Sequence, residues 1–127
     1  MFVALLVGPH HPLHEPALGL FRRVVDGALG LVVTPIVVAE LVYVSRSLLR
    51  WPRGKTAERV GSLLQADGLI LMERAAILSA LDLYGRRARL DFADAYLAAT
   101  AVRTGPPVVA SFDGNFDRMA GLRRITG

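Results

Sequence analysis

Four carboxylate side chains occupy positions where an apolar α/β scaffold normally has none. Glu40 lies within the apolar run Val37–Val42, Asp94 lies in an alanine-rich segment, and Asp113 and Asp117 lie close together near the end of the sequence. A buried ionised carboxylate costs several kcal/mol unless it is paired or binds a metal. Several carboxylates that converge on one point repel each other, and a hard divalent cation relieves that repulsion. These residues therefore favour a metal-dependent enzyme.

Each acid also has a purely structural interpretation. Asp91 would cap a helix at its N-terminus, and Asp94 would then be a first-turn carboxylate that the helix dipole favours. Asp113 would be a turn residue and Asp117 a solvated helix residue. Glu40 would form a salt bridge to an arginine, although a surface position fits poorly with the valines and leucines around it.

Composition narrows the class of protein. A length of 127 residues predicts a single domain over residues 1–127, and an apolar fraction of 53% excludes disorder. The absence of cysteine excludes disulfides, thiolate zinc sites and cysteine nucleophiles, and it fits a cytoplasmic location. The formal charge of +4, with arginine supplying nearly all the positive charge, favours a polyanionic partner.

The apolar stretch 27–45 is long enough to raise the question of a membrane span. Thr34, Pro35 and Glu40 lie near its middle, and a central acid opposes insertion into the bilayer. A buried strand, a turn and a helix explain the stretch better. The apolar start at residues 1–9 lacks the basic region and the cleavage site of a targeting segment. We therefore expect no membrane interaction.

Hydrophobic periodicity predicts alternating helices and strands. Gly30 is expected to end the first helix, and Thr34 and Pro35 to begin the second. Asp91 is expected to cap a later helix. Helices are predicted over 13–29, 35–49, 55–66, 73–87, 91–103 and 115–120, and strands over 31–33, 69–72, 108–110 and 124–126.

Strands that alternate with helices are typical of a parallel sheet covered by helices on both faces. Functional sites of such sheets lie at the carboxyl ends of the strands. Asp113 comes shortly after the strand 108–110, and Glu40 and Asp94 lie within two turns of predicted helix starts. We therefore expect these acids to reach the same end of the sheet.

Other signatures of catalysis are weak or missing. His10, His11 and His14 lie beside prolines in an irregular segment, so a role as metal ligands is a minor alternative. The sequence contains no glycine-rich phosphate loop, no nucleophile elbow and no His-Glu-x-x-His motif. A metal-dependent phosphatase is not supported either, because no Asp-x-Asp nucleophile pair is present.

The candidate acids lie in three segments, which in chain order are Pro35–Leu41, Asp91–Ala99 and Ser111–Asp117. Taken together, these segments resemble the PIN-domain nucleases, and within them the VapC-type toxins of toxin–antitoxin pairs. The resemblance covers essentially the whole chain. It implies a PIN-like three-layer α/β/α fold with a parallel central sheet of five strands. It also implies clustered acids that bind Mg²⁺ or Mn²⁺ and hydrolytic cleavage of RNA.

The resemblance also assigns roles to residues. Glu40, Asp94 and Asp113 match core acids of the family, Asp117 matches a more variable auxiliary acid, and Ser111 matches a position beside the site. The implied partners are an RNA substrate, a VapB-like antitoxin and a second copy of the chain in a homodimer. Several arginines are candidates for the RNA path, namely Arg46, Arg50, Arg53, Arg86, Arg87 and Arg89.

One departure from the family pattern affects the expected activity. The family opens with a strand that ends in Asp-Thr-Asn or Asp-Thr-Ser, whereas residues 1–7 resemble the helix that follows that motif. We expect the first strand and its aspartate to be missing because of a start placed too late. The alternative is a catalytically impaired PIN-fold protein that acts as an RNA- or antitoxin-binding module.

Overall fold

The computed structural model describes residues 1–104, 108–110, 114 and 123–125. The chain divides into two compact units, residues 1–73 and residues 74–127. Each unit combines helices with a parallel pair of strands, which confirms the predicted α/β class. The single-domain organisation stays a prediction.

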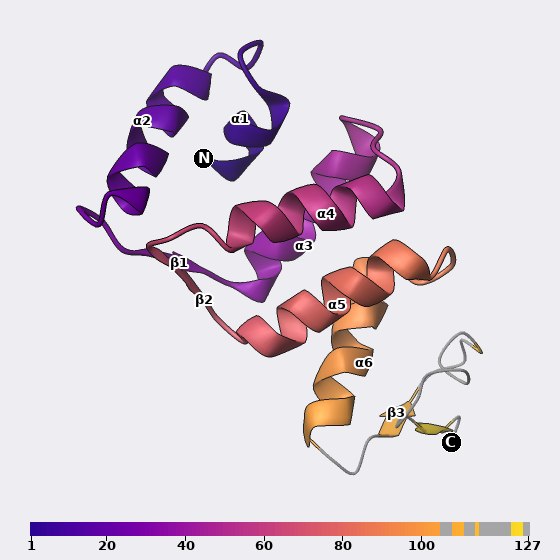
Figure 1. The fold of residues 1–127 in the computed structure, drawn as a ribbon. Coiled ribbons are helices and arrows are strands. Elements are labelled where there is room, and N and C mark those ends of the chain that lie inside the picture. Colours follow the sequence, from indigo (N-terminus) through magenta and orange to yellow (C-terminus); the bar gives the residue numbers. More distant parts are fainter. Residues whose placement is uncertain (105–107, 111–113, 115–122, 126–127) are drawn as a thin grey trace. The chain divides into compact units, whose positions relative to one another are not determined.

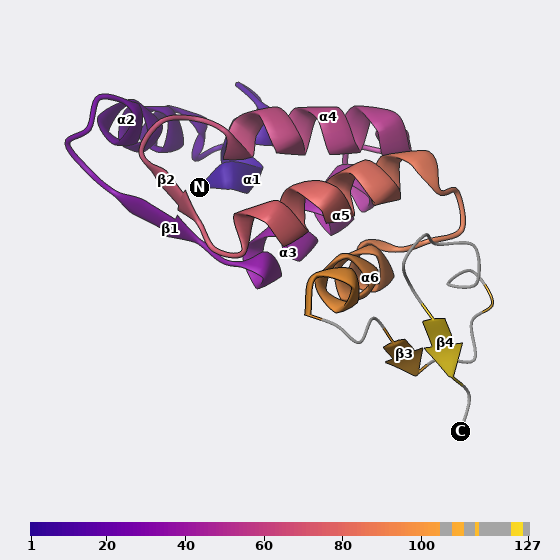
Figure 2. The ribbon, with the colours of Figure 1, turned by 60° about the horizontal axis from the view of Figure 1, so that its bottom comes forward.

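The first unit holds the parallel strand pair β1 (Leu31–Val33) and β2 (Leu69–Leu71), which Figures 1 and 2 show side by side. Val32 lies opposite Ile70 and Val33 lies opposite Leu71. Val33 and Leu71 are buried, whereas Val32 and Ile70 are more than half exposed. The elements are α1 (Phe2–Val7), α2 (His14–Val25), β1 (Leu31–Val33), α3 (Pro35–Ser47), α4 (Arg53–Leu64) and β2 (Leu69–Leu71).

Helix α2 ends four residues before its predicted end, because Gly27 rather than Gly30 terminates it. Gly27 has a φ of 84°, in the left-handed region that favours glycine. Its N–H donates to the carbonyl oxygen of Val24 at 3.1 Å. The N–H of Ala28 donates to the carbonyl oxygen of Arg23 at 2.9 Å. These two bonds form a Schellman motif, which satisfies the last carbonyl groups of the helix.

The chain enters β2 through Gly68, in close contact with the end of α2. Gly68 has a φ of 86°, and a β-carbon built on it would lie 2.2 Å from the carbonyl oxygen of Val24. No side chain fits in that space. Residues 67–68 form a turn, and its glycine is required by both backbone conformation and packing.

Helix α3 begins as the sequence predicts. The hydroxyl of Thr34 accepts a hydrogen bond from the N–H of Val37 at 3.4 Å, and Pro35 occupies the first turn. The buried face of α3 consists of residues spaced three and four apart, which is the helical repeat. These residues are Val38, Leu41, Val42 and Ser45.

The second unit holds the helices α5 (Arg74–Arg86) and α6 (Phe92–Thr104) and the strands β3 (Val108–Ala110) and β4 (Arg123–Ile125). Tyr84 and Phe92 join the two helices through an edge-to-face contact, with ring centroids 6.4 Å apart. Strand β3 pairs in parallel with β4, and Figure 2 shows the two strands adjacent. The strand predicted at 124–126 begins one residue earlier, and the helix predicted at 115–120 lies outside the described residues.

Candidate active site

The first turn of α6 holds Asp94 in a capped and half-buried position. The Oδ1 atom of Asp91 accepts a hydrogen bond from the N–H of Asp94 at 2.8 Å, which confirms Asp91 as the N-cap. Asp94 is the acidic residue of that first turn, where unpaired N–H groups and the helix dipole favour negative charge. The side chain of Asp91 thus positions the backbone that carries Asp94.

Small buried residues fix α6 behind this turn. Ala95 is fully buried, Ala98 and Ala99 are nearly so, and α6 packs closely on α5. Because closely packed interiors leave little room for displacement, the helix that carries Asp94 is held rigidly within its unit. A rigid element is what a site with defined geometry requires.

Glu40 differs from the prediction made for it. Its side chain is exposed rather than buried, and it lies on the face of α3 that also carries Ile36 and Tyr43. Within residues 1–73, all of which the structure describes, Glu40 forms no ion pair and no side-chain hydrogen bond. The predicted burial is therefore wrong, and the alternative of a salt bridge to an arginine is not met in these residues.

The reason for this error lies in the composition of α3, which is apolar nearly all round. Ile36 is 80% exposed and Tyr43 is 71% exposed, so an apolar residue on this helix does not indicate burial. Glu40 and Ser47 share that face at helical spacing. In the sequence, the helical spacing of these two polar residues was the signal that could have identified the exposed face of α3.

The four predicted acids are distributed over both units of the chain. Glu40 lies in the first unit and Asp94 in the second, and Asp113 and Asp117 lie outside the described residues. Among the residues that the structure describes, no three His, Asp or Glu side chains form a group that could hold a metal ion. The four-carboxylate metal site therefore stays a prediction.

The chemistry of the available donors fits a hard divalent cation. Glu40 and Asp94 offer carboxylate oxygens, the ligands that Mg²⁺ prefers. Two of the three histidines make local contacts: a ring nitrogen of His11 accepts from the N–H of Leu13 at 3.0 Å, and a ring nitrogen of His14 lies 3.3 Å from the carbonyl oxygen of Ala4. Of the donors considered, the carboxylates are the ones that suit a hard cation.

A basic cluster surrounds the only tryptophan of the chain, between α3 and α4. The ammonium group of Lys55 lies 4.9 Å from the centroid of the Trp51 ring, and Arg46 donates to the carbonyl oxygen of Trp51. Arg50 and Arg53 lie on either side of this residue in sequence, and no acid occurs between Glu40 and Glu58. Positive charge interleaved with an aromatic ring is typical of surfaces that bind single-stranded nucleic acid.

No helix in the described part of the chain has the length and hydropathy that crossing a membrane requires. This agrees with the interpretation of residues 27–45 as a strand, a turn and a helix.

A comparison with family models identifies the fold. The PIN-domain model matches residues 1–122, whereas comparisons with curated proteins and with solved structures gave no match. PIN domains are α/β nucleases that hydrolyse nucleic acids and generally use divalent metal ions. The parallel strand pairs and their covering helices are consistent with this α/β/α arrangement. Because the match spans nearly the full sequence, the chain belongs to the PIN-domain family.

Proposed function

We propose that this protein is an endoribonuclease that depends on Mg²⁺ or Mn²⁺ and serves as the toxin of a VapBC-type toxin–antitoxin pair in the cytoplasm. The observation that carries the proposal is the PIN-domain match over residues 1–122. The capped first turn of α6 supports it, because that turn presents Asp94 at a position where the backbone favours negative charge.

The carboxylates have distinct roles in this proposal. Asp94 and Asp113 would hold the cation, Glu40 would bind it directly or through water, and Asp117 would complete the shell or orient a water. When bound, the cation supplies the Lewis acidity that activates water and neutralises charge on the phosphate oxygens. Asp91 positions Asp94 by holding its N–H. No side chain of the protein is needed as the nucleophile.

The basic cluster around Trp51 supports RNA as the substrate. Four cations, Arg46, Arg50, Arg53 and Lys55, lie within ten residues of sequence without an acid among them. Phosphate contacts dominate the affinity of proteins for nucleic acids, and a base stacks readily on an aromatic ring. We therefore assign this cluster to the path of the RNA strand.

The exposed apolar face of α3 supports the proposed protein partners. Ile36 and Tyr43 lie on the same face as Glu40, and both are strongly exposed. Exposed apolar patches of this kind mark protein interaction sites. We assign this face to the homodimer or to the VapB-like antitoxin, which would cover Glu40 when it docks.

The test is cleavage of a panel of structured RNAs by the 127-residue chain in the presence of Mn²⁺, Mg²⁺ or EDTA. The expected result is cleavage that requires the metal and is abolished in Asp94→Asn. Asp67→Asn is the matched control, because Asp67 is an exposed turn residue far in sequence from the proposed ligands. Equal cleavage by Asp94→Asn and the wild type would refute the proposal.

A second candidate function is a binding module without catalysis, which the exposed face of α3 favours. The same experiment separates the two functions. A folded chain that binds the RNA panel, or a VapB-like peptide, without metal-dependent cleavage would be a binding module.

A further inference from the structure

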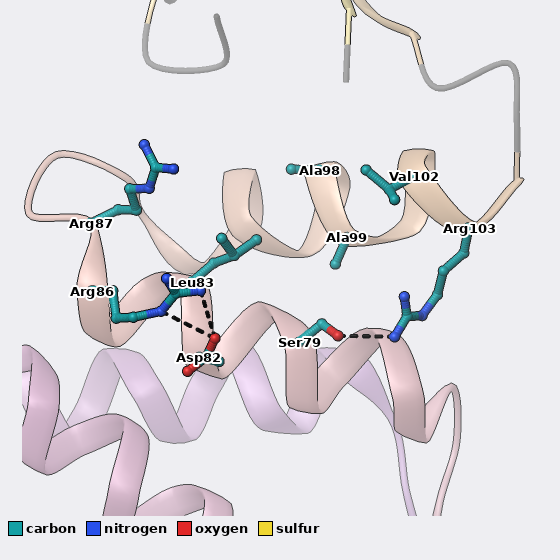
Figure 3. Close-up of a pocket in the computed structure, with 9 residues that line it drawn as sticks. All are labelled: Ser79, Asp82, Leu83, Arg86, Arg87, Ala98, Ala99, Val102 and Arg103. Atoms are coloured by element: carbon teal, nitrogen blue, oxygen red, sulfur yellow. Dashed lines mark hydrogen bonds and ion pairs between the residues drawn. The ribbon is translucent and has the colours of Figure 1, made fainter. Parts of the chain in front are cut away.

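The second unit contains a pocket that the proposed function leaves unassigned, although Arg86 and Arg87, which line it, are candidates for the RNA path from the sequence. It lies between α5 and α6 and has a volume of about 370 Å³. Figure 3 shows Arg86 and Arg87 at one end, Arg103 at the other end, and the apolar side chains of Leu83 and Val102 between them. The pocket is thus basic at both ends, with polar Ser79 and Asp82 as well as apolar side chains between them.

The two basic ends are held differently. Arg103 donates from Nη2 to the hydroxyl of Ser79 at 2.9 Å and to the carbonyl oxygen of Ala75 at 3.2 Å. Within the part of the chain that the structure describes, its Nε and Nη1 atoms donate to no other group. Arg103 is therefore fixed in place while part of its guanidinium group remains available to a ligand.

At the other end, Arg86 forms an ion pair with Asp82 at 2.7 Å. Both side chains are more than 60% exposed, and exposed pairs of this kind contribute little to stability. A phosphate group can therefore compete with Asp82 for Arg86, because the planar guanidinium group binds two phosphate oxygens at once. Among the described residues that line the pocket, three arginines and one aspartate carry a formal charge of +2.

The length of the pocket indicates the class of ligand. Ser79, the partner of Arg103, and Arg86 lie seven residues apart on α5, which corresponds to about 10 Å along a helix axis. A single phosphate bound at one end would leave the cations of the other end without a ligand. A strand that carries phosphates on successive nucleotides can contact both ends, and its base or ribose would then lie over the apolar side chains between them.

The pocket also lies on the same side of α6 as Asp94. Asp94, Ala98 and Val102 follow one another at intervals of four residues, so they share one face of the helix. Ala98 and Val102 line the pocket, and Asp94 lies one turn nearer the N-terminus. A strand in the pocket would extend toward the turn that carries Asp94.

We infer that the α5–α6 pocket is a docking groove for single-stranded RNA, in which Arg86, Arg87 and Arg103 contact phosphates and direct the strand toward Asp94. This inference rests on the proposed endoribonuclease function, and it assigns a substrate-binding role to Arg103 and the pocket around it.

The experiment measures binding without catalysis. A short single-stranded RNA with a 5′-fluorescein label is titrated with the full chain in EDTA, and fluorescence anisotropy gives Kd at several salt concentrations. The double variant Arg86→Gln/Arg87→Gln should weaken binding by about 10-fold and lower the slope of log Kd against log salt by about 1.4, the value for two lost phosphate contacts. Circular dichroism verifies that the variant is folded.

Two further variants make the outcome specific. The matched control is Arg22→Gln/Arg23→Gln, which removes two adjacent exposed arginines from the last turn of α2. This variant should leave both Kd and the salt slope unchanged. Asp82→Asn raises the pocket charge from +2 to +3 and should tighten binding by about 3-fold. A merely structural role for the pocket does not predict a gain in affinity.

The inference fails if the wild type does not bind the RNA, or if the Arg86/Arg87 and Arg22/Arg23 variants weaken binding equally. It also fails if a glutamate oligomer of the same charge binds as tightly as the RNA, since the pocket would then select an acidic peptide. Inorganic phosphate and AMP serve as competitors, and displacement of the RNA by either at similar concentration would show a mononucleotide site instead. Because no metal is present, these outcomes are independent of whether the chain cleaves RNA.

Discussion

Helices α3 and α6 begin alike and then differ. Each has 13 residues. Before each helix, a side-chain oxygen accepts a hydrogen bond from the backbone N–H three residues later. This oxygen belongs to Thr34 in α3 and to Asp91 in α6. In α6 the predicted acid is Asp94, which is half-buried and whose N–H donates to this oxygen. In α3 the predicted acid, Glu40, lies at the sixth position of the helix on an exposed face.

This difference indicates how strongly each helix constrains the orientation of the carboxylate that it carries. Asp94 is oriented by a cap, by the helix dipole and by closely packed alanines behind it. Glu40 has none of these constraints within the described residues, so it is free to adapt to a ligand or to a partner. Asp94 should therefore act as the fixed point of the site and Glu40 as an adaptable member.

The largest effect is expected for the acids themselves. Asp94→Asn should lower metal-dependent RNA cleavage by at least about 100-fold, whereas Glu40→Gln should lower it by about 10-fold, because an adaptable ligand is more easily replaced by water. Initial rates under identical Mn²⁺ concentrations measure both variants. Glu58→Gln, an exposed glutamate on α4, is the control. Equal losses for Asp94→Asn and Glu40→Gln would abolish the distinction between the two acids.

The caps should have smaller effects that differ in kind. Asp91→Ala and Thr34→Ala should each lower the free energy of unfolding by about 1 kcal/mol, the usual contribution of an N-cap. Only Asp91→Ala should also lower cleavage, because Asp91 positions the turn of Asp94. Denaturant unfolding measures the free energy of unfolding of each variant, and initial rates of RNA cleavage by the folded variants measure the activity. A loss of activity in Thr34→Ala of the same size would contradict a specific role for Asp91.

The smallest effect is expected on the exposed face of α3. Ile36→Lys should change the free energy of unfolding of the monomer by less than about 0.5 kcal/mol, since the side chain is 80% exposed in the single chain. Thermal unfolding measures this, and light scattering shows whether the substitution changes the molecular mass in solution. Truncation of a buried aliphatic side chain typically costs about 2–5 kcal/mol. A fall of about 2 kcal/mol or more in the free energy of unfolding would therefore mean that this face is covered.

Local signals predicted much of this fold, and tertiary packing decided the rest. The caps at Thr34 and Asp91 depend on residues only three positions away, so the sequence alone identified them. The end of α2 was missed because two glycines were available, and only the backbone conformation distinguishes Gly27 from Gly30. Short-range patterns are reliable for such features when a single residue can fulfil the role.

The candidate site was predictable only in part. Asp94 has its predicted place in a helix start, but the exposure of Glu40 could not be predicted from a helix with apolar residues on all faces. The α5–α6 pocket was not predicted at all, because Arg103 and Ser79 are 24 residues apart in sequence and only the packing of two helices brings them together. Asp113 lies outside the described residues, so its predicted role is untested.

The close approach at Gly68 has a consequence for how this sequence can vary. A β-carbon at position 68 would collide with the backbone of Val24, whereas one at Gly54 would meet nothing within 4 Å. A saturation library selected only for folding should therefore recover glycine alone at position 68 and many residues at position 54. In homologous chains, a residue other than glycine at position 68 would show that α2 and β2 have moved apart, which makes this site a marker of how far the fold has diverged.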